Sequence, residues 1–174
     1  MKYFTKEQIN KGWSSDRKYC LTDENGSRYL LRVSDIAQLG VKQQEFDMMK
    51  RVASLGVPMC MPIEFGVCED SVSSVQSWID GVDAEEVMKK LSDTEQYEYG
   101  LEAGRILRKI HSIPAPAEQE DWESRFNRKI DNKIKKYSEC PIKCDNGQAF
   151  IEYINANRGL LKNRLQVYQH GDYH

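Results

Sequence analysis

The chain has 174 residues, with 25 Lys and Arg against 27 Asp and Glu, which gives a formal net charge of −2 and a pI near 6.0. This balance argues against nucleic acid as the main partner, because a phosphate backbone is bound by a surplus of basic residues. No apolar run approaches the ~20 residues that cross a bilayer, and the first residues lack the apolar stretch of a secretory signal. Together with an odd number of cysteines, five, these features predict no membrane partner and a cytoplasmic protein with free thiols.

The start of the chain has the pattern of a short helix followed by a pair of strands. Thr5 and Gln8 form a capping-box pattern, which predicts a short opening helix. The small-residue loop 12–16 could join two strands. Residues 18–22 and 28–34 read as strands with an Asn-Gly turn between them, which is typical of a β-hairpin.

The next segment reads as one helix followed by two more strands. The helix is expected over residues 42–55, and Gly56 ends it. Glu45 lies on the apolar stripe of this helix, where a carboxylate needs a partner because an unpaired buried charge is costly. Strands are expected over residues 62–68 and 72–79.

Helical patterns dominate from residue 83 onward. Helices are expected over residues 84–91, 94–111, 118–137 and 150–157. The helix expected over residues 118–137 has apolar residues at strict four-residue spacing, which indicates core or helix-pairing surface rather than a cofactor site. A short strand is expected over 165–169. Cys140 and Cys144 form a close pair, but without a nearby His or further Cys they do not predict a zinc site.

Several segments, in this order, resemble the aminoglycoside phosphotransferase and choline kinase-like family, whose fold is that of the protein kinases. The segments that carry the resemblance are residues 12–16, 29–34, Glu45, 78–81, 104–107, 110–111 and 170–174, the last reading His-Gly-Asp-Tyr-His. The resemblance covers nearly the whole chain. Its specificity comes from the order and spacing of the segments together.

The resemblance implies a cationic strand residue on the nucleotide phosphates, paired with a helix carboxylate. Arg32 occupies the strand position and Glu45 is its expected partner. Arginine keeps the positive charge of the family's lysine but presents a planar fork instead of a point charge. A plain strand-to-helix salt bridge is the structural alternative for this pair.

Two further segments are expected to contact the nucleotide. Ser77, Trp78 and Ile79 resemble the hinge between the lobes, where backbone N–H and C=O groups bind the purine edge; packing explains Trp78 equally well. Ser14 and Ser15 resemble the flexible loop that covers the phosphates, a task that hydroxyl and free N–H groups suit. A solvated hairpin loop is the alternative for these two serines.

The terminal motif carries the chemistry that the resemblance implies. Asp172 resembles the catalytic aspartate, which orients the acceptor hydroxyl and accepts its proton as the oxygen attacks the γ-phosphoryl group. Gly171 would let the backbone bend, and His170 would hold the loop through hydrogen bonds. In the family an asparagine five residues later and a second aspartate bind magnesium. Both are expected beyond residue 174, so we expect no metal ligands within the chain and little or no turnover by these 174 residues alone.

The sequence therefore predicts an α+β, protein-kinase-like bilobal fold. Residues 1–80 would form a nucleotide-binding lobe with a small antiparallel sheet plus one helix, and residues 81–174 an incomplete, mainly helical lobe that ends at the catalytic loop. The predicted cofactors are ATP or GTP with Mg²⁺.

The predicted function is the transfer of a nucleotide phosphate to a hydroxyl of a small molecule. An aminoglycoside-like acceptor is expected, because the acidic residues of segment 118–123 could attract its amino groups; a solvated helix face explains them as well. A non-catalytic nucleotide-binding or interaction fragment is the alternative. A protein kinase is disfavoured, because the sequence lacks a Gly-x-Gly-x-x-Gly loop and a His-Arg-Asp motif.

Overall fold

The computed structural model describes residues 3–12, 14–171 and 173. The chain divides into two compact units. The N-terminal unit is Met1–Ile110 and the C-terminal unit is His111–His174. The boundary predicted near residue 80 separates the two lobes of a kinase. It is a different boundary from the one between these two units, and it stays a prediction.

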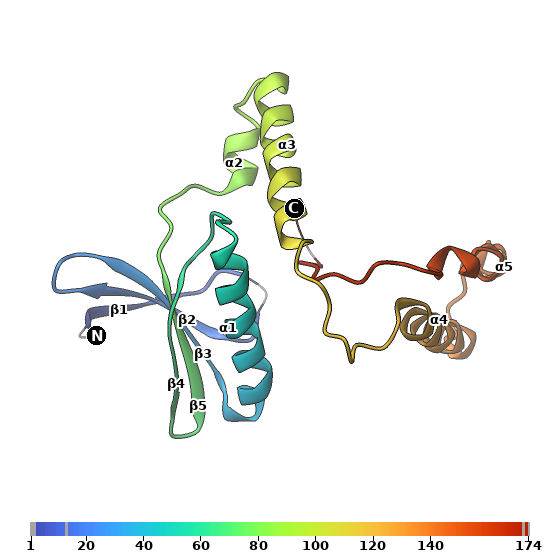
Figure 1. Ribbon diagram of the computed structural model, residues 1–174, viewed down its shortest axis with the longest axis horizontal. Coiled ribbons are helices and arrows are strands. Elements are labelled where there is room, and N and C mark those ends of the chain that lie inside the picture. The colour runs from blue at the N-terminus through green and yellow to red at the C-terminus, as the bar shows by residue number, and fades with distance from the viewer. Residues whose placement is uncertain (1–2, 13, 172, 174) are drawn as a thin grey trace. The chain divides into compact units, whose positions relative to one another are not determined.

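An antiparallel sheet forms the centre of the N-terminal unit (Figure 1). In the described part of the chain it has five strands, in the order β1-β2-β3-β5-β4. Their bounds are β1 Tyr3–Ile9, β2 Arg17–Asp23, β3 Arg28–Asp35, β4 Pro62–Cys68 and β5 Ser71–Ser77. The hairpin of β4 and β5 joins the sheet through β5, which pairs with β3 along its length.

The first strand corrects the prediction of an opening helix. Residues Tyr3–Ile9 pair with β2, with Thr5 opposite Thr22 and Gln8 opposite Tyr19. The capping-box pattern is a local signal, whereas strand pairing depends on a partner further along the chain. The β2–β3 hairpin is confirmed. Asp23 Oδ1 accepts from the backbone N–H groups of Asn25 and Ser27 at 2.9 and 2.8 Å, and closes the turn.

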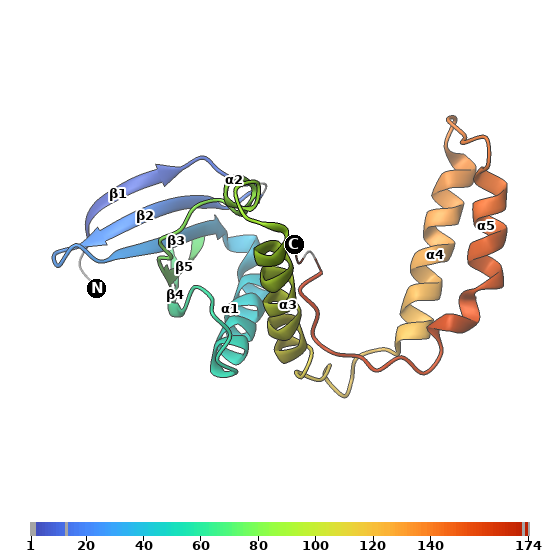
Figure 2. The ribbon, with the colours of Figure 1, turned by 90° about the horizontal axis from the view of Figure 1, so that it is seen from above.

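The helix α1, Leu39–Ser54, packs against β4 and β5 (Figure 2). A short 3-10 turn, η1 Ile36–Gln38, leads into it. Phe46 is buried, and its ring lies 5.3 Å from that of Phe65 on β4. Val72 and Val75 of β5 are buried as well. The buried residues of α1 are Phe46 and Val52, whereas Glu45, which the sequence placed on the apolar stripe, has a side chain that is 54% exposed.

Two helices complete the N-terminal unit, α2 Ala84–Met88 and α3 Asp93–Ile110. The second begins with a reciprocal cap between Ser92 and Glu95. The Ser92 N–H donates to Glu95 Oε2 at 2.8 Å, and the Glu95 N–H donates to Ser92 Oγ at 3.4 Å. Among the described residues, none of the helices is long and apolar enough to span a membrane.

The C-terminal unit is built on a pair of helices, α4 Trp122–Glu139 and α5 Gly147–Ala156, followed by the 3-10 turn η2 Arg158–Leu161. The strand predicted over 165–169 is reduced to a bridge between Pro114 and Val167. Two backbone hydrogen bonds flank that bridge. The Ala115 N–H donates to the Gln166 carbonyl at 3.1 Å, and the Tyr168 N–H donates to the Ile113 carbonyl at 2.8 Å.

Candidate functional site

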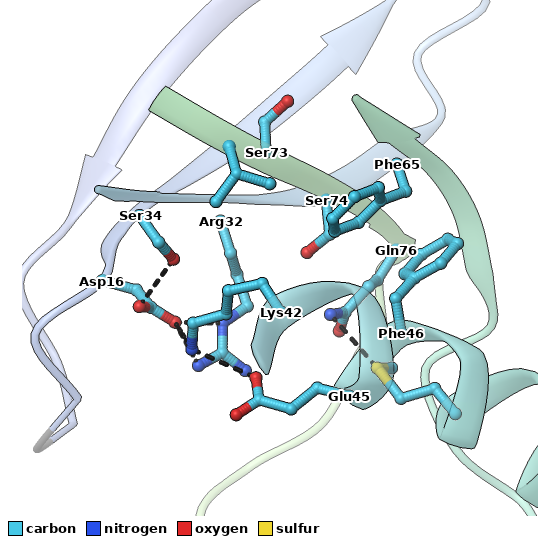
Figure 3. Close-up of a pocket in the computed structure, with 12 residues that line it drawn as sticks. Asp16, Arg32, Ser34, Lys42, Glu45, Phe46, Phe65, Ser73, Ser74 and Gln76 are labelled. Atoms are coloured by element: carbon cyan, nitrogen blue, oxygen red, sulfur yellow. Dashed lines mark hydrogen bonds and ion pairs between the residues drawn. The ribbon is translucent and has the colours of Figure 1, made fainter. Parts of the chain in front are cut away.

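A small pocket lies between α1 and the sheet of the N-terminal unit (Figure 3). Its polar lining comes from the residue before β2, from β3, from α1 and from β5. The polar residues are Asp16, Arg32, Ser34, Lys42, Glu45, Ser73, Ser74 and Gln76. The cavity has a volume of about 30 Å³, which is enough space for water. In this arrangement the polar side chains fill most of the space between one another.

Asp16 is the centre of this polar cluster. Its side chain is only 2% exposed. Arg32 donates from Nε and Nη2 to Asp16 Oδ2 at 3.1 and 2.6 Å, and Ser34 Oγ donates to Oδ1 at 2.8 Å. Both carboxylate oxygens are therefore held, one by a guanidinium and one by a hydroxyl.

The order of residues along the strands explains this geometry. Arg32 and Ser34 are two residues apart on β3, so their side chains leave the same face of the sheet. Arg17 on β2 pairs with Val33 on β3, which places the preceding residue, Asp16, beside that face. The register of one strand pair thus brings the carboxylate to its two donors.

The helix α1 adds a second cation and a second carboxylate. Lys42 Nζ lies 3.3 Å from Asp16 Oδ2 and 3.1 Å from Glu45 Oε2. Lys42 and Glu45 are three residues apart, which puts them on one side of the helix. Arg32 and Glu45 line the same pocket, but the structure corrects the predicted pairing of these two residues. Among the described residues, Arg32 pairs with Asp16, and Lys42 bridges Asp16 and Glu45.

The electrostatics of the cluster keep Asp16 charged. Burial raises the pKa of the Asp16 carboxyl, but hydrogen bonds from Ser34, Arg32 and Lys42 outweigh that effect and hold the pKa below its usual range. At neutral pH the cluster therefore joins two carboxylates to two cations. Sequence reasoning did not assign a role to Asp16 or Lys42. The signals were present, since Asp16 ends the small-residue loop and Lys42 lies one turn before Glu45.

The loop between β1 and β2 carries Ser14 and Ser15, both exposed. Gly12 has a φ of +91°, a backbone conformation that favours glycine. Within the described residues, the N–H groups of Ser14 and Ser15 have no backbone or side-chain acceptor. Both serines are exposed, and their contact with nucleotide phosphates stays a prediction.

The predicted hinge follows β5 directly. Ser77 N–H donates to the Met61 carbonyl at 2.9 Å, and Trp78 N–H donates to the Arg28 carbonyl at 3.3 Å. The guanidinium of Arg28 also lies over the Trp78 ring, 5.3 Å from its centroid. Ile79 is exposed, and no acceptor for its N–H is found in the described part of the chain. Of the three hinge residues, Ile79 has the N–H group that remains open to a ligand.

The terminal motif is described only in part. Gly171 has a φ of +83°, which agrees with the bend expected there. The rings of His170 and Tyr173 meet edge to face at 5.4 Å. Asp172, the predicted catalytic residue, lies outside the described residues. Its role stays a prediction.

Comparison with known proteins gives a family and a fold. The model of the phosphotransferase enzyme family matches residues 5–174. A search of curated protein sequences found no significant match. A solved ternary complex of streptomycin, ATP and APH(2")-IIa has a TM-score of 0.58 at 16% identity, over 90% of this chain and 54% of that one.

Two other solved structures give similar values. Amicoumacin kinase hAmiN in complex with AMP-PNP, Ca²⁺ and Ami has a TM-score of 0.53 at 14% identity, over 92% of this chain and 50% of that one. An aminoglycoside phosphotransferase from Alicyclobacillus acidocaldarius has a TM-score of 0.51 at 13% identity, over 91% of this chain and 48% of that one. The α+β, kinase-like fold class predicted from the sequence is confirmed. The chain spans about half the length of these three proteins.

Proposed function

The chain belongs to the phosphotransferase enzyme family, and we propose that it binds ATP or GTP and serves the transfer of the γ-phosphate to a hydroxyl of a small molecule. The observation that carries this proposal is the pair of cations, Arg32 and Lys42, at the base of the loop that holds Ser14 and Ser15. Phosphoryl transfer depends on cations and backbone N–H groups that neutralise and orient a polyphosphate. Both kinds of group are present on this side of the N-terminal unit.

Each group has a distinct part in the proposed binding. Arg32 contacts the phosphates, and Glu45 holds Lys42 from α1. The N–H groups of Ser14 and Ser15 cover the phosphates from the β1–β2 loop. The Ile79 N–H binds the purine edge, because Ser77 and Trp78 already donate theirs within the protein.

The chemical step is assigned to Asp172. Its carboxylate accepts the proton of the acceptor hydroxyl while the oxygen of that hydroxyl bonds to the γ-phosphorus. The bond from the γ-phosphorus to the β,γ-bridging oxygen breaks, and the nucleoside diphosphate leaves with that oxygen. Gly171 and His170 shape the loop that presents the carboxylate.

Magnesium, when bound with the nucleotide, would neutralise phosphate charge. Among residues 3–12, 14–171 and 173, no group of three or more His, Cys, Asp or Glu side chains could hold a metal ion. Because Mg²⁺ on a nucleotide is usually held by one or two carboxylates together with the phosphates, none of the described residues is assigned to the metal.

The acceptor is proposed to be aminoglycoside-like. Glu118, Glu120, Asp121 and Glu123 form an acidic segment around the start of α4, which could attract a polyamine. In the structure Glu120 pairs with Arg128, and Asp121 accepts from the Ser124 N–H as the helix cap. Glu118 and Glu123 are the members of this segment with the most freedom to meet a cationic substrate.

A nucleotide-binding module without turnover is the second candidate. It is favoured by the coverage of the matches, which extend over about half the length of each relative. Under this proposal the N-terminal unit binds nucleotide, and these 174 residues alone release little or no ADP.

Both candidates are tested by nucleotide binding and turnover on the same sample. We expect ATP or GTP with Mg²⁺ to raise the melting temperature, and Arg32→Ala to abolish that shift. Arg105→Ala is the matched control, because Arg105 is exposed on α3 and pairs with Glu102. Nucleotide-dependent phosphorylation of streptomycin would support the enzyme, and binding without turnover would support the module. A wild-type chain that neither shifts nor binds would overturn both.

A further inference from the structure

The Asp16 cluster has a feature that nucleotide binding alone does not explain: a nearly buried carboxylate among the cations meant for phosphate. We propose that Asp16 is a positioning residue of the nucleotide site, whose carboxylate holds Arg32 and Lys42 side by side so that both cations meet the phosphates. The proposal rests on the proposed function, and it makes Lys42 a second phosphate-binding cation beside Arg32.

The contacts show how the carboxylate could do this. One oxygen, Oδ2, is shared by Arg32 at 2.6 Å and Lys42 at 3.3 Å, and the other, Oδ1, is fixed by Ser34 at 2.8 Å. The Asp16 side chain is 2% exposed, whereas those of Arg32 and Lys42 are 33% and 18% exposed. The carboxylate is therefore inside, and part of each cation remains accessible to a ligand.

The guanidinium keeps a donor for that ligand. Arg32 uses Nε and Nη2 on Asp16. Its Nη1 has no hydrogen-bond acceptor among the described residues. An arginine fork held on one edge presents its remaining N–H groups in a fixed direction, which suits a phosphate oxygen.

A carboxylate is needed between Arg32 and Lys42 because the two side chains carry the same charge. Two cations that meet one polyphosphate must lie close together, where they repel each other in a partly dry pocket. Asp16 lies between them and cancels that repulsion before any ligand arrives. Glu45 faces the cluster from α1 and holds Lys42 from its other side. A site arranged in advance loses less side-chain freedom when the ligand binds.

Asp16 also joins the loop to the cations. It directly follows Ser15, so its hydrogen bonds tie the base of the β1–β2 loop to β3 and α1. The loop N–H groups and the two cations are then presented to the same ligand as one unit.

Asp16→Asn separates this proposal from simple electrostatics. Removing a negative charge beside a polyphosphate site strengthens anion binding if Asp16 is only a counter-ion. Positioning predicts the opposite. We expect the Kd for ATP with Mg²⁺, measured by calorimetry, to rise about tenfold as the two cations lose their shared anchor. The Kd for adenosine, measured by NMR titration, should not change, because adenosine has no phosphate.

Two more variants complete the test. Asp47→Asn is the matched control, since Asp47 is an exposed carboxylate of α1 that pairs with Lys50, and it should leave both Kd values unchanged. Ser34→Ala keeps every charge but frees Oδ1 of Asp16. It should weaken ATP binding by about threefold and leave adenosine binding unchanged. This variant serves if Asp16→Asn does not fold.

Each result decides the matter. Equal or tighter ATP binding by Asp16→Asn, or equal weakening for ATP and adenosine, would overturn the positioning role and leave the proposed function standing. A wild-type chain that binds no ATP would overturn both proposals. Loss for ATP alone, in Asp16→Asn or in Ser34→Ala, supports the positioning role.

Discussion

The two units of the chain bury their side chains very differently. Among the described residues of the N-terminal unit, the buried apolar side chains are Leu21, Phe46, Val52, Val57, Val72, Val75 and Ile110. In the described part of the C-terminal unit, the buried residues are Ile113 and Gly147. Large side chains such as Phe150, Tyr153 and Leu165 are 63%, 70% and 87% exposed. The sheet and α1 therefore form a core, whereas α4 and α5 depend on other contacts.

Polar contacts in the C-terminal unit join α4 to the 3-10 turn η2 and to the loop before α5. Arg158 donates to Asn127 at 2.8 Å and to Asp131 at 2.6 Å, both on α4. Tyr137 Oη accepts from the Cys144 N–H at 3.0 Å, between the two helices. A unit of this size has little volume for a core. We therefore expect most of the folding free energy of this chain to come from the unit that carries the Asp16 cluster.

The strongest test of this comparison removes one phenylalanine from each unit. Phe46→Ala should cost about 3–5 kcal/mol of unfolding free energy, because Phe46 is 3% exposed and packs on Phe65. Phe150→Ala, the matched control, should change stability by less than about 0.5 kcal/mol, since its ring is mostly in solvent. Urea unfolding followed by circular dichroism measures both. Equal costs would show that the C-terminal unit buries more than its described contacts indicate.

The second test concerns the C-terminal unit, at the close approach of Tyr137 to Gly147. A Cβ added at Gly147 would lie 1.9 Å from Tyr137 Oη and 2.7 Å from Cζ. Gly147→Ala must therefore displace the tyrosine ring and its hydrogen bond to Cys144, at a cost of about 1–3 kcal/mol.

Hydrogen exchange can localise that effect. Amides of α4 and α5 should exchange faster in Gly147→Ala, while amides of the β-sheet should not change. Gly159→Ala is the control, because a Cβ there meets nothing within 4 Å. Faster exchange in the sheet would mean that the two units unfold as one.

Local signals predicted most elements of the fold. The Asn-Gly turn, the glycine after α1 and the helical period beyond residue 83 each depend on neighbours in sequence, and the structure has the corresponding hairpin and helices. The prediction of an opening helix was wrong. Thr5 and Gln8 match the local pattern of a helix cap, but the structure of that segment is determined by its pairing with β2. The strand predicted over 165–169 is reduced to one bridge for a similar reason, since the bridge partner of Val167 within the described part of the chain is Pro114.

The candidate site was predictable to a lesser degree. The resemblance drew attention to Arg32 and Glu45, and both line the pocket. The contact of Asp16 with Ser34 depends on the pairing of β2 with β3 extending to Arg17 and Val33. The hairpin turn fixes the register of this pair, but the strand predicted from the sequence began only at residue 18. The position of Lys42 depends in the same way on how α1 packs against the sheet.

The smallest expected effect is the acid sensitivity of the Asp16 cluster. Burial raises the pKa of Asp16, and bonds from Ser34, Arg32 and Lys42 lower it further than burial raises it. A carboxyl whose folded pKa is below its ordinary value of 3.8 stabilises the protein above that value, and this contribution disappears as the pH falls through the folded pKa. The stability difference between wild type and Asp16→Asn should therefore be constant above about pH 5 and shrink on further acidification.

In the C-terminal unit the Glu120–Arg128 pair is exposed, so Glu120→Gln should change the unfolding free energy less than Asp16→Asn does. Its effect should also fade with added salt. Thermal unfolding of both variants across this pH range, at low and high salt, measures the contrast. A difference for Asp16→Asn that stays constant at acidic pH would mean that its contacts do not favour the charged form.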